Sequence, residues 1–332
     1  MVSRDQGVLT IVGDAVIDHI YRTDKLPAEG DTVHGRYEKH FGGKGLNRAV
    51  AAARLGLRVR LISAVGGDIA GRRIIRYLKR QGVDTELVKT VDGESTPVVA
   101  VIIASSGATG IINDSDNAVR LSRDDLRTAA ARSALTSADA VLLTFEPPIA
   151  VIDQALGVIR RGRTRPRLLV HATPPTNSPQ YISKYFGRID YLIGKHRELA
   201  GLVADPARTP QTPATDLDFD VDVAPQLLAQ GVGSVCAVER FECSVRSAAL
   251  NLDVPRSFAA VLVDSPGSSA AFSAAFAYRL LTAGRPADRA DFEWATAAMA
   301  ATQSFSDVSG AMPSVSEIDR IARLPTSSDD HS

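Results

Sequence analysis

The chain has 332 residues, of which 45% are hydrophobic and 23% charged, a composition typical of a soluble globular protein. Lysine plus arginine equals aspartate plus glutamate at 38 each, so no basic excess favours nucleic acid or an anionic membrane as a partner. Two cysteines are too few for a disulfide framework, which favours a reduced, cytoplasmic setting. The N-terminus predicts a first strand rather than a signal peptide, and no apolar run approaches the roughly 20 residues of a membrane span.

The first apolar run, residues 8–12, predicts a strand buried on both faces of a parallel sheet. Gly13, Asp14 and Asp18 follow it, and ligands gather at the carboxyl ends of strands in open α/β sheets. Residues 19–37 alternate weakly and contain turn residues, so they predict short strands that form a small flap.

A glycine-rich stretch comes next, with the sequence HFGGKGLNR at residues 40–48 and an Ala-rich helix behind it. Its glycines allow the backbone to approach a ligand closely. After it, residues 57–65 predict a strand and residues 71–81 a helix closed by Gly82. A strand at 98–104 and a return at 110–112 predict a hairpin.

The rest of the chain alternates between helical and strand patterns, which predicts a parallel, doubly wound sheet. The predicted helices cover residues 123–134, 149–160, 196–203, 224–230 and 292–304, and the predicted strands cover 140–145, 168–170, 190–193 and 234–238. The arginine cluster at 160–167 predicts a solvated loop, and residues 204–222 a long surface insertion.

The stretch VDSPGSSAAF, at residues 263–272, combines the end of an apolar strand, a turn and the start of a small-residue helix. A helix start directs free N–H groups and the positive end of its dipole outward, so this stretch predicts an anion-binding turn.

Two motifs together resemble a known family. FGGKGLNRAVAAARLG is similar to the first signature of the PfkB, or ribokinase-like, carbohydrate kinases, and VDSPGSSAAFSAAF stands where their second signature lies. GDAVID, GESTPVVAVII and GAMPSVSEID extend the resemblance over nearly the whole chain, closest in pattern to the ribokinases.

The resemblance implies a ribokinase-like α/β fold: a doubly wound, mostly parallel sheet flanked by helices, with a small β-sheet lid. The domain would cover residues 1–324, with lid segments at about 17–37 and 96–112 and a flexible tail at 325–332. It also implies a homodimer formed through the lids.

On the sugar side, the family's binding positions match residues that suit hydroxyl groups: Asp18, Gly43, Lys44, Asn47, Asn117 and Glu146. The implied ligand is a sugar, nucleoside or polyol. Val16 stands where an Asn usually helps to hold the sugar, so the ligand either lacks that hydroxyl or differs from ribose.

The family uses ATP and Mg²⁺, but its nucleotide and catalytic motifs are altered here. The G-A-G-D turn reads Gly267-Ser268-Ser269-Ala270, so Ala270 replaces the catalytic base and leaves an anion-hole remnant. The nucleotide loop at 238–243 begins at Val238 and loses both glycines, one to Arg240. The N-x-x-E motif keeps Glu198, the candidate metal ligand, but replaces its Asn with Lys195, and N-P-A-P begins with His171.

These features lead to a first hypothesis: a sugar-binding family member without ATP phosphotransferase activity, acting as a sensor or as the partner of an unidentified protein. A second hypothesis is an active kinase whose base has moved to His171 or Asp264. A third is a different enzyme on the same scaffold, and a fourth is a purely structural subunit.

Overall fold

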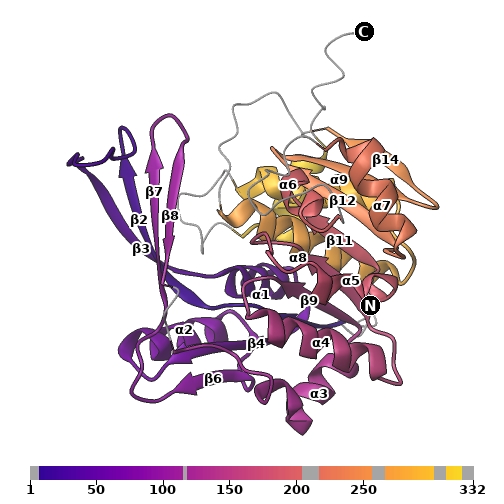
Figure 1. The fold of residues 1–332 in the computed structure, drawn as a ribbon, viewed down its shortest axis with the longest axis horizontal. Helices are drawn as coiled ribbons and strands as arrows, with labels where there is room; N and C mark the ends of the chain where they lie inside the picture. Colours follow the sequence, from indigo (N-terminus) through magenta and orange to yellow (C-terminus); the bar gives the residue numbers. More distant parts are fainter. Residues whose placement is uncertain (1–6, 115–117, 204–216, 256–265, 303–311, 324–332) are drawn as a thin grey trace.

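The fold is seen in a computed structural model that describes residues 7–114, 118–203, 217–255, 266–302 and 312–323 (Figure 1). It contains a ten-stranded sheet and a separate four-stranded sheet. In spatial order, the main path of the large sheet is β14 (Asn251–Val254), β13 (Glu242–Ser247), β12 (Ser234–Glu239), β11 (Tyr191–Gly194), β10 (Arg167–His171), β9 (Ala140–Thr144), β1 (Val8–Val12), β4 (Arg58–Gly66) and β5 (Val83–Asp84), and β6 (Val88–Val91) pairs with β4.

All strand pairs from β12 to β5 are parallel, whereas β12–β13 and β13–β14 are antiparallel. The predicted, mostly parallel sheet is therefore confirmed. Its strands are continuous apolar runs because helices cover both faces. In β9, Leu142 lies in the core on one face, while its neighbours Val141 and Leu143 lie in the core on the other.

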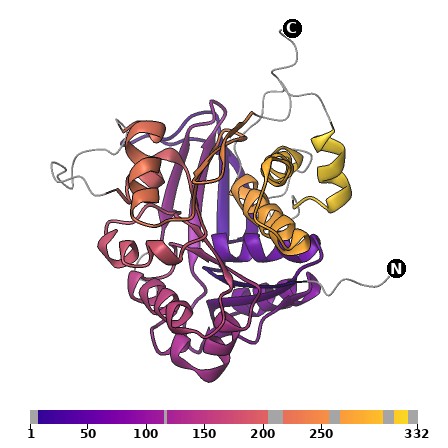
Figure 2. The same cartoon turned by 90° about the vertical axis from the view of Figure 1, so that its right-hand side faces the viewer.

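Small and aromatic side chains dominate the helices of the first face, which is the face covered by the orange and yellow helices in Figure 2. Phe276 stacks on Phe292 at 4.6 Å between ring centroids, which joins two long helices over the sheet. The helices of this face are α1 (Lys44–Arg54), α2 (Ile69–Arg80), α8 (Pro266–Ala283), α9 (Arg289–Ala301) and α10 (Val315–Ala322).

The second face is covered by helices that bury aliphatic side chains against the alternate residues of the same strands. These helices are α3 (Ala129–Thr136), α4 (Ile149–Arg161), α5 (Gln180–Ser183), α6 (His196–Ala200) and α7 (Ala224–Ala229). Among the described residues, no helix has both the length and the apolar character needed to cross a membrane.

The small sheet rises from one end of the large one (Figure 1). Its order is β3 (Gly35–Gly42), β2 (Val16–Thr23), β7 (Val98–Ala104) and β8 (Thr109–Asn113). The hairpin expected at 98–112 is present as β7 and β8, which pair antiparallel. β3 continues past Tyr37 to Gly42, so the sheet extends beyond the expected lid boundary and leads directly into the glycine-rich stretch.

Some predicted boundaries are wrong. The helix expected at 123–134 is divided, because Thr128 ends a 3₁₀ turn (Asp125–Arg127) and its hydroxyl caps α3 by accepting from the Ala131 N–H. The helix expected at 196–203 ends at Ala200. Residues 219–223 form a π-helical turn that leads into α7, although residues 204–222 were expected to be a surface insertion. The apolar strand expected to end at the start of residues 263–272 and the expected tail lie outside the described residues.

The β12–β13 connection is a two-residue turn formed by Arg240 and Phe241, closed by pairing of Glu239 with Glu242. Both turn residues have positive φ, 52° and 64°. Two-residue hairpins favour this left-handed backbone. Glycine or asparagine normally occupies such positions, because most other side chains strain the backbone there. The turn thus keeps a glycine-like backbone without glycine. Burial of the Phe241 side chain, of which only 4% is exposed, offsets part of this strain.

We predict that Arg240→Asn stabilises the protein, because asparagine tolerates the left-handed backbone better than arginine. The free energy of unfolding should rise by about 0.5–1 kcal/mol in urea titrations. Arg240→Ala is the control, since alanine removes the same side chain but keeps the strain. Equal stability of the Asn and Ala variants would contradict this account of the turn.

Candidate functional site

The candidate site lies along one edge of the large sheet, where the carboxyl ends of its parallel strands meet. β1, β9, β10, β11 and β12 are neighbours in that order along this edge. Residues 13–14, Glu146, His171, Lys195 and residues 238–240 lie at or just beyond these strand ends. The strand order reverses beside β1, which is the position where open α/β sheets bind ligands.

Glu146 fixes the glycine-rich stretch at this edge. Its carboxylate accepts hydrogen bonds from the backbone N–H groups of Lys44 at 2.7 Å, Gly45 at 3.1 Å and Asp14 at 3.0 Å. Lys44 and Gly45 begin α1, so a carboxylate just beyond β9 caps a helix whose own N-cap, Gly43, has no side chain to do so. The expected ligand residue Glu146 is thus also a structural clamp.

Glycine is required in this stretch for two separate reasons. Gly43 has a φ of 97°, which disfavours any side chain, and an added Cβ would collide with the Asp14 carbonyl. A Cβ on Gly13 would lie 2.7 Å from the Cα of Gly45, so the two backbones touch where β1 ends and α1 begins. This contact places the first turn of α1 directly over the end of β1.

Two carboxyl groups beside Glu146 are perturbed. Burial, and next the charge of Glu146, raises the pKa of Asp18 to about 6, against the opposing charges of Lys44 and His40. The same two causes raise the pKa of Asp14 to about 7, although its side chain is only half-buried. Asp18, on β2, covers Gly42, where a Cβ would collide with its carboxylate. The predicted sugar residues Asp18, Lys44 and Glu146 therefore lie together.

The remaining sugar-side predictions differ in outcome. Asn47 is buried on α1, and its Oδ1 atom has no hydrogen-bond partner among the described residues. Val16 is buried in β2, where it pairs with Gly42. Asn117 lies outside the described residues.

The predicted anion-binding turn forms the start of α8. This helix begins at Pro266, so Gly267, Ser268 and Ser269 occupy its first turn. Ala270 is fully buried in the core, so the expected base position faces packed side chains and offers no proton acceptor. Asp264 lies outside the described residues.

A buried arginine that the sequence reasoning missed reaches this turn. Arg48 follows Asn47 on α1 and is only 2% exposed. Its Nη2 donates to Nδ1 of His171 at 2.8 Å and to Oγ of Ser269 at 3.1 Å, and its Nη1 donates to the Lys44 carbonyl at 3.1 Å. Burial lowers its pKa to about 10, so it stays charged at neutral pH. The sequence did contain one signal for Arg48, namely its position inside the glycine-rich signature.

Arg48 also fixes the protonation of His171. Because a guanidinium only donates hydrogen bonds, Nδ1 of His171 must accept, and the ring proton then lies on Nε2. Nε2 is 3.3 Å from Oγ of Ser269. Burial, and next the Arg48 charge, holds the pKa of His171 well below its usual value. His171 is therefore a neutral hydrogen-bond donor to Ser269.

The nucleotide-side residues also meet at this edge. Gly194, the last residue of β11, pairs with Ala237 on β12, so Lys195 and Val238 follow a paired position on neighbouring strands. The side chain of Glu198 accepts from the Lys195 N–H at 2.8 Å, which makes it part of a capping box on α6. Within the described ranges, no three His, Cys, Asp or Glu side chains form a metal-binding group. A Mg²⁺ ion here would take most of its ligands from phosphates and water.

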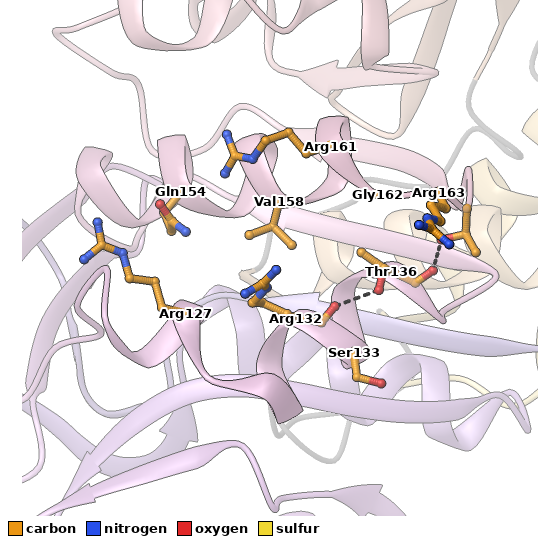
Figure 3. A pocket seen from close by; sticks show the side chains of 10 residues that line it. Arg127, Arg132, Ser133, Thr136, Gln154, Val158, Arg161, Gly162 and Arg163 are labelled. Atoms are coloured by element: carbon orange, nitrogen blue, oxygen red, sulfur yellow. Dashed lines mark hydrogen bonds between the residues drawn. The ribbon is translucent and has the colours of Figure 1, made fainter.

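The residues present fit ATP poorly. The two expected glycine positions of the nucleotide loop hold Arg240, in the strained turn, and Cys243, which is buried in β13. A hollow of about 510 Å³ exists elsewhere, between α3 and α4, and arginines line it: Arg127, Arg132, Arg161 and Arg163 (Figure 3). α3 and α4 precede β9 and β10 in the chain, and their C-terminal ends lie near the starts of these strands. The hollow therefore lies at the edge of the sheet opposite the candidate site.

Residues 8–310 match the model of the pfkB family of carbohydrate kinases. The chain is 32% identical to the ribokinase of Haemophilus influenzae over 155 residues, which is 46% of this chain and 50% of that protein. It is 25% identical to the ribokinase of Dictyostelium discoideum over 291 residues, which is 84% of this chain and 89% of that protein. The more similar stretch therefore spans about half the length of the Haemophilus relative.

Solved structures share the whole architecture. The ribokinase of Giardia lamblia superposes with a TM-score of 0.80 at 18% identity, over 95% of this chain and 98% of that chain. The ribokinase of Thermotoga maritima gives 0.75 at 20% identity, over 95% and 99%. The ribokinase of Arabidopsis thaliana complexed with ribose and ATP gives 0.73 at 22% identity, over 96% and 99%. The predicted fold class is confirmed.

We predict that Asp18→Asn becomes more stable relative to wild type as pH rises. The raised pKa of Asp18 means that the folded protein holds this proton when the unfolded chain has released it. The stability that this proton provides is complete below the unfolded pKa of 3.8 and is lost as pH rises through about 6. Asparagine mimics the neutral carboxyl and avoids this loss.

The measurement is urea unfolding of both proteins between about pH 4 and pH 7, where each unit of pKa shift corresponds to about 1.4 kcal/mol. Asp24→Asn, at an exposed aspartate, is the matched control. A constant stability difference between wild type and Asp18→Asn across this range would show that Asp18 ionises normally in the folded protein.

Proposed function

Because the chain belongs to the pfkB family of carbohydrate kinases, we propose that it binds a sugar, nucleoside or polyol without transferring phosphate to it from ATP. Such a protein acts as a ligand sensor or as the partner of another enzyme. The single observation that carries this proposal is Ala270, which is fully buried at the start of α8 where the family resemblance implies a carboxylate.

Phosphoryl transfer to a sugar requires removal of the hydroxyl proton as well as stabilisation of the phosphoryl charge. Positioned proton transfer contributes about 10²–10⁴-fold to the rate. A methyl group cannot accept a proton. Arg48 can stabilise negative charge at the start of α8, but it cannot act as a base because it remains a cation.

His171 does not replace the missing base. Its lone pair on Nδ1 accepts from Arg48, and its Nε2 carries the ring proton that faces Ser269. A relocated base at His171 would need the opposite tautomer and the loss of the Arg48 hydrogen bond. This geometry favours the first hypothesis over an active kinase that uses His171.

The nucleotide side supports the same conclusion. Arg240 fills the turn where a glycine-rich loop would approach the nucleotide, and Glu198 is already bound to the Lys195 N–H. The polar sugar-side cluster remains, with Asp18, Lys44 and Glu146 within mutual electrostatic reach. Polar residues retained on the sugar side, together with altered motifs on the nucleotide side, form the pattern expected of an inactive family member.

The proposal is tested with the purified full chain by thermal shift against separate sugar and nucleotide panels, together with coupled ADP release. We expect sugars or polyols to raise the unfolding temperature through mass action. We expect ADP release at least about 100-fold below ordinary kinase rates of about 1–100 per second. Sustained ADP release at ordinary rates with any sugar would refute the proposal.

Ala270→Asp is the companion variant, with Ala270→Asn as its uncharged control. We expect neither variant to gain activity, because Lys195 and Arg240 still alter the nucleotide side. A gain specific to Asp would instead show that a working nucleotide site remains and that one carboxylate is all that is missing.

We also propose that two copies pair through the small sheet. Tyr21 and Tyr37 pair across β2 and β3, and both are exposed, as is Ile112 on β8, which the strand register places on the same face. The rings of Tyr21 and Tyr37 contact each other at a tilted angle of 40°, with 5.3 Å between ring centroids. Burying such a face against a second copy would remove apolar surface from water.

Sedimentation of wild type and Ile112→Lys tests this pairing. We expect a dimer for wild type and a shift toward monomer for the variant, because the lysine would bring a charge into the apolar contact. Ile69→Lys is a matched control, since Ile69 on α2 is 64% exposed and Ile112 is 65% exposed. A monomeric wild type, or equal effects of both substitutions, would count against pairing through the small sheet.

A further inference from the structure

Arg48 is a buried cation, and no carboxylate among the described residues forms an ion pair with it. Its three hydrogen bonds go to neutral acceptors: the Lys44 carbonyl, His171 Nδ1 and Ser269 Oγ. Glu146 and Glu198 influence it electrostatically, but both carboxylates bind backbone N–H groups, and Glu146 also pairs with the Lys44 ammonium. Buried charges are normally paired, so an unpaired arginine at this depth lacks its counter-ion.

Arg48 and Ser269 both have hydrogen-bond donors to spare. Its Nε atom is buried and has no hydrogen-bond partner among the described residues. Both lone pairs of the Ser269 hydroxyl are taken, one by Arg48 and one by His171, so its own proton must point to another acceptor. Ser269 also lies in the first turn of α8, an 18-residue helix whose positive end adds to the charge.

Asn47, the neighbour of Arg48 on α1, has the complementary deficit. Its Oδ1 atom is buried and accepts no hydrogen bond in the described part of the chain. A hydroxyl group is the natural donor to such an atom in a sugar site. Arg48 thus lacks an anionic acceptor, and Asn47, its neighbour on the same helix, lacks a hydroxyl donor.

From these two deficits, we propose that the ligand carries its own anionic group, a phosphate or a carboxylate, on a hydroxylated carbon chain. Arg48 and Ser269 bind the anionic group at the start of α8, and Asn47 binds a hydroxyl. The ligand class is therefore a sugar phosphate or a sugar acid rather than a neutral sugar. This inference rests on the proposed function and narrows its ligand.

Isothermal titration calorimetry with the full chain compares ribose, ribose 5-phosphate and ribonate, together with inorganic phosphate alone and ATP alone. We expect ribose 5-phosphate or ribonate to bind about 10- to 100-fold more tightly than ribose, the range of a charge-assisted hydrogen bond. Comparing the phosphate with the carboxylate identifies which anionic group the site prefers.

Arg48→Gln should abolish this preference while leaving the affinity for ribose within a few-fold. Arg80→Gln is the matched control, because it removes one exposed arginine from α2 and should retain the full preference. Thermal unfolding checks that each variant is folded. If Arg48→Gln does not fold, Ser269→Ala carries the test, and it should reduce the preference by about fivefold through loss of one hydrogen bond.

Equal affinity for ribose and both anionic ligands would overturn this inference and leave the proposed function intact. A preference that survives in Arg48→Gln and in Ser269→Ala would also overturn it. Inorganic phosphate or ATP binding as tightly as ribose 5-phosphate, in an Arg48-dependent manner, would show that the anion is not part of a sugar ligand. Ordinary rates of ADP release would refute the proposed function alone. Failure of both ribose 5-phosphate and ribonate to bind would overturn this inference, and the sugar panel would still test the proposed function.

Discussion

One carboxylate organises the candidate site. Glu146, just beyond β9, accepts from backbone N–H groups that follow β1 and begin α1, and it is the external cap of that helix. α1 in turn carries Asn47 and Arg48, and Arg48 reaches β10 and α8 through His171 and Ser269. The position of the candidate sugar-side residues relative to the predicted anion-binding turn thus depends on where Glu146 holds the first turn of α1. Its structural task and its expected ligand role are inseparable.

Much of the fold follows from local patterns. Continuous apolar runs identified β1, β9 and β10, because a parallel sheet covered on both faces needs apolar residues at every position. Glycines marked the contact between β1 and α1, because the backbones touch there. Helix boundaries were less predictable, since Thr128 divided a helical pattern by capping α3 with its side chain. A single sequence does not reveal which of several compatible conformations such a residue selects.

The site was predictable where glycines and carboxylates formed a motif, and less so where tertiary contacts decide. Arg48 lay in the motif, yet nothing local shows that its guanidinium crosses to His171 and Ser269, residues more than 100 positions away. The protonation of His171 could not be inferred either, because it depends on that contact. At Arg240 the sequence suggested more change than the structure has, because the turn keeps a glycine-like backbone although the glycine is replaced.

The electrostatic character of the α8 turn differs from that of a proton-abstracting site. Ala270 supplies no negative charge, while Arg48 and the helix start supply positive charge, with His171 held neutral between them. These features are mutually consistent, because a protonated His171 would place two cations in contact. This positive environment matches the proposed anionic ligand, and the described residues of the turn lack a group that would remove a proton.

The adjacency of Asn47 and Arg48 on a single rigid helix has a consequence for entropy. α1 is packed between the sheet and α8, so the two side chains keep a fixed separation before any ligand arrives. A ligand whose hydroxyl and anionic groups are covalently joined loses translational and rotational freedom once, whereas separate fragments lose it twice. In the proposed binding mode, the helix therefore favours one ligand that carries both groups at the right spacing over separate fragments that carry one group each.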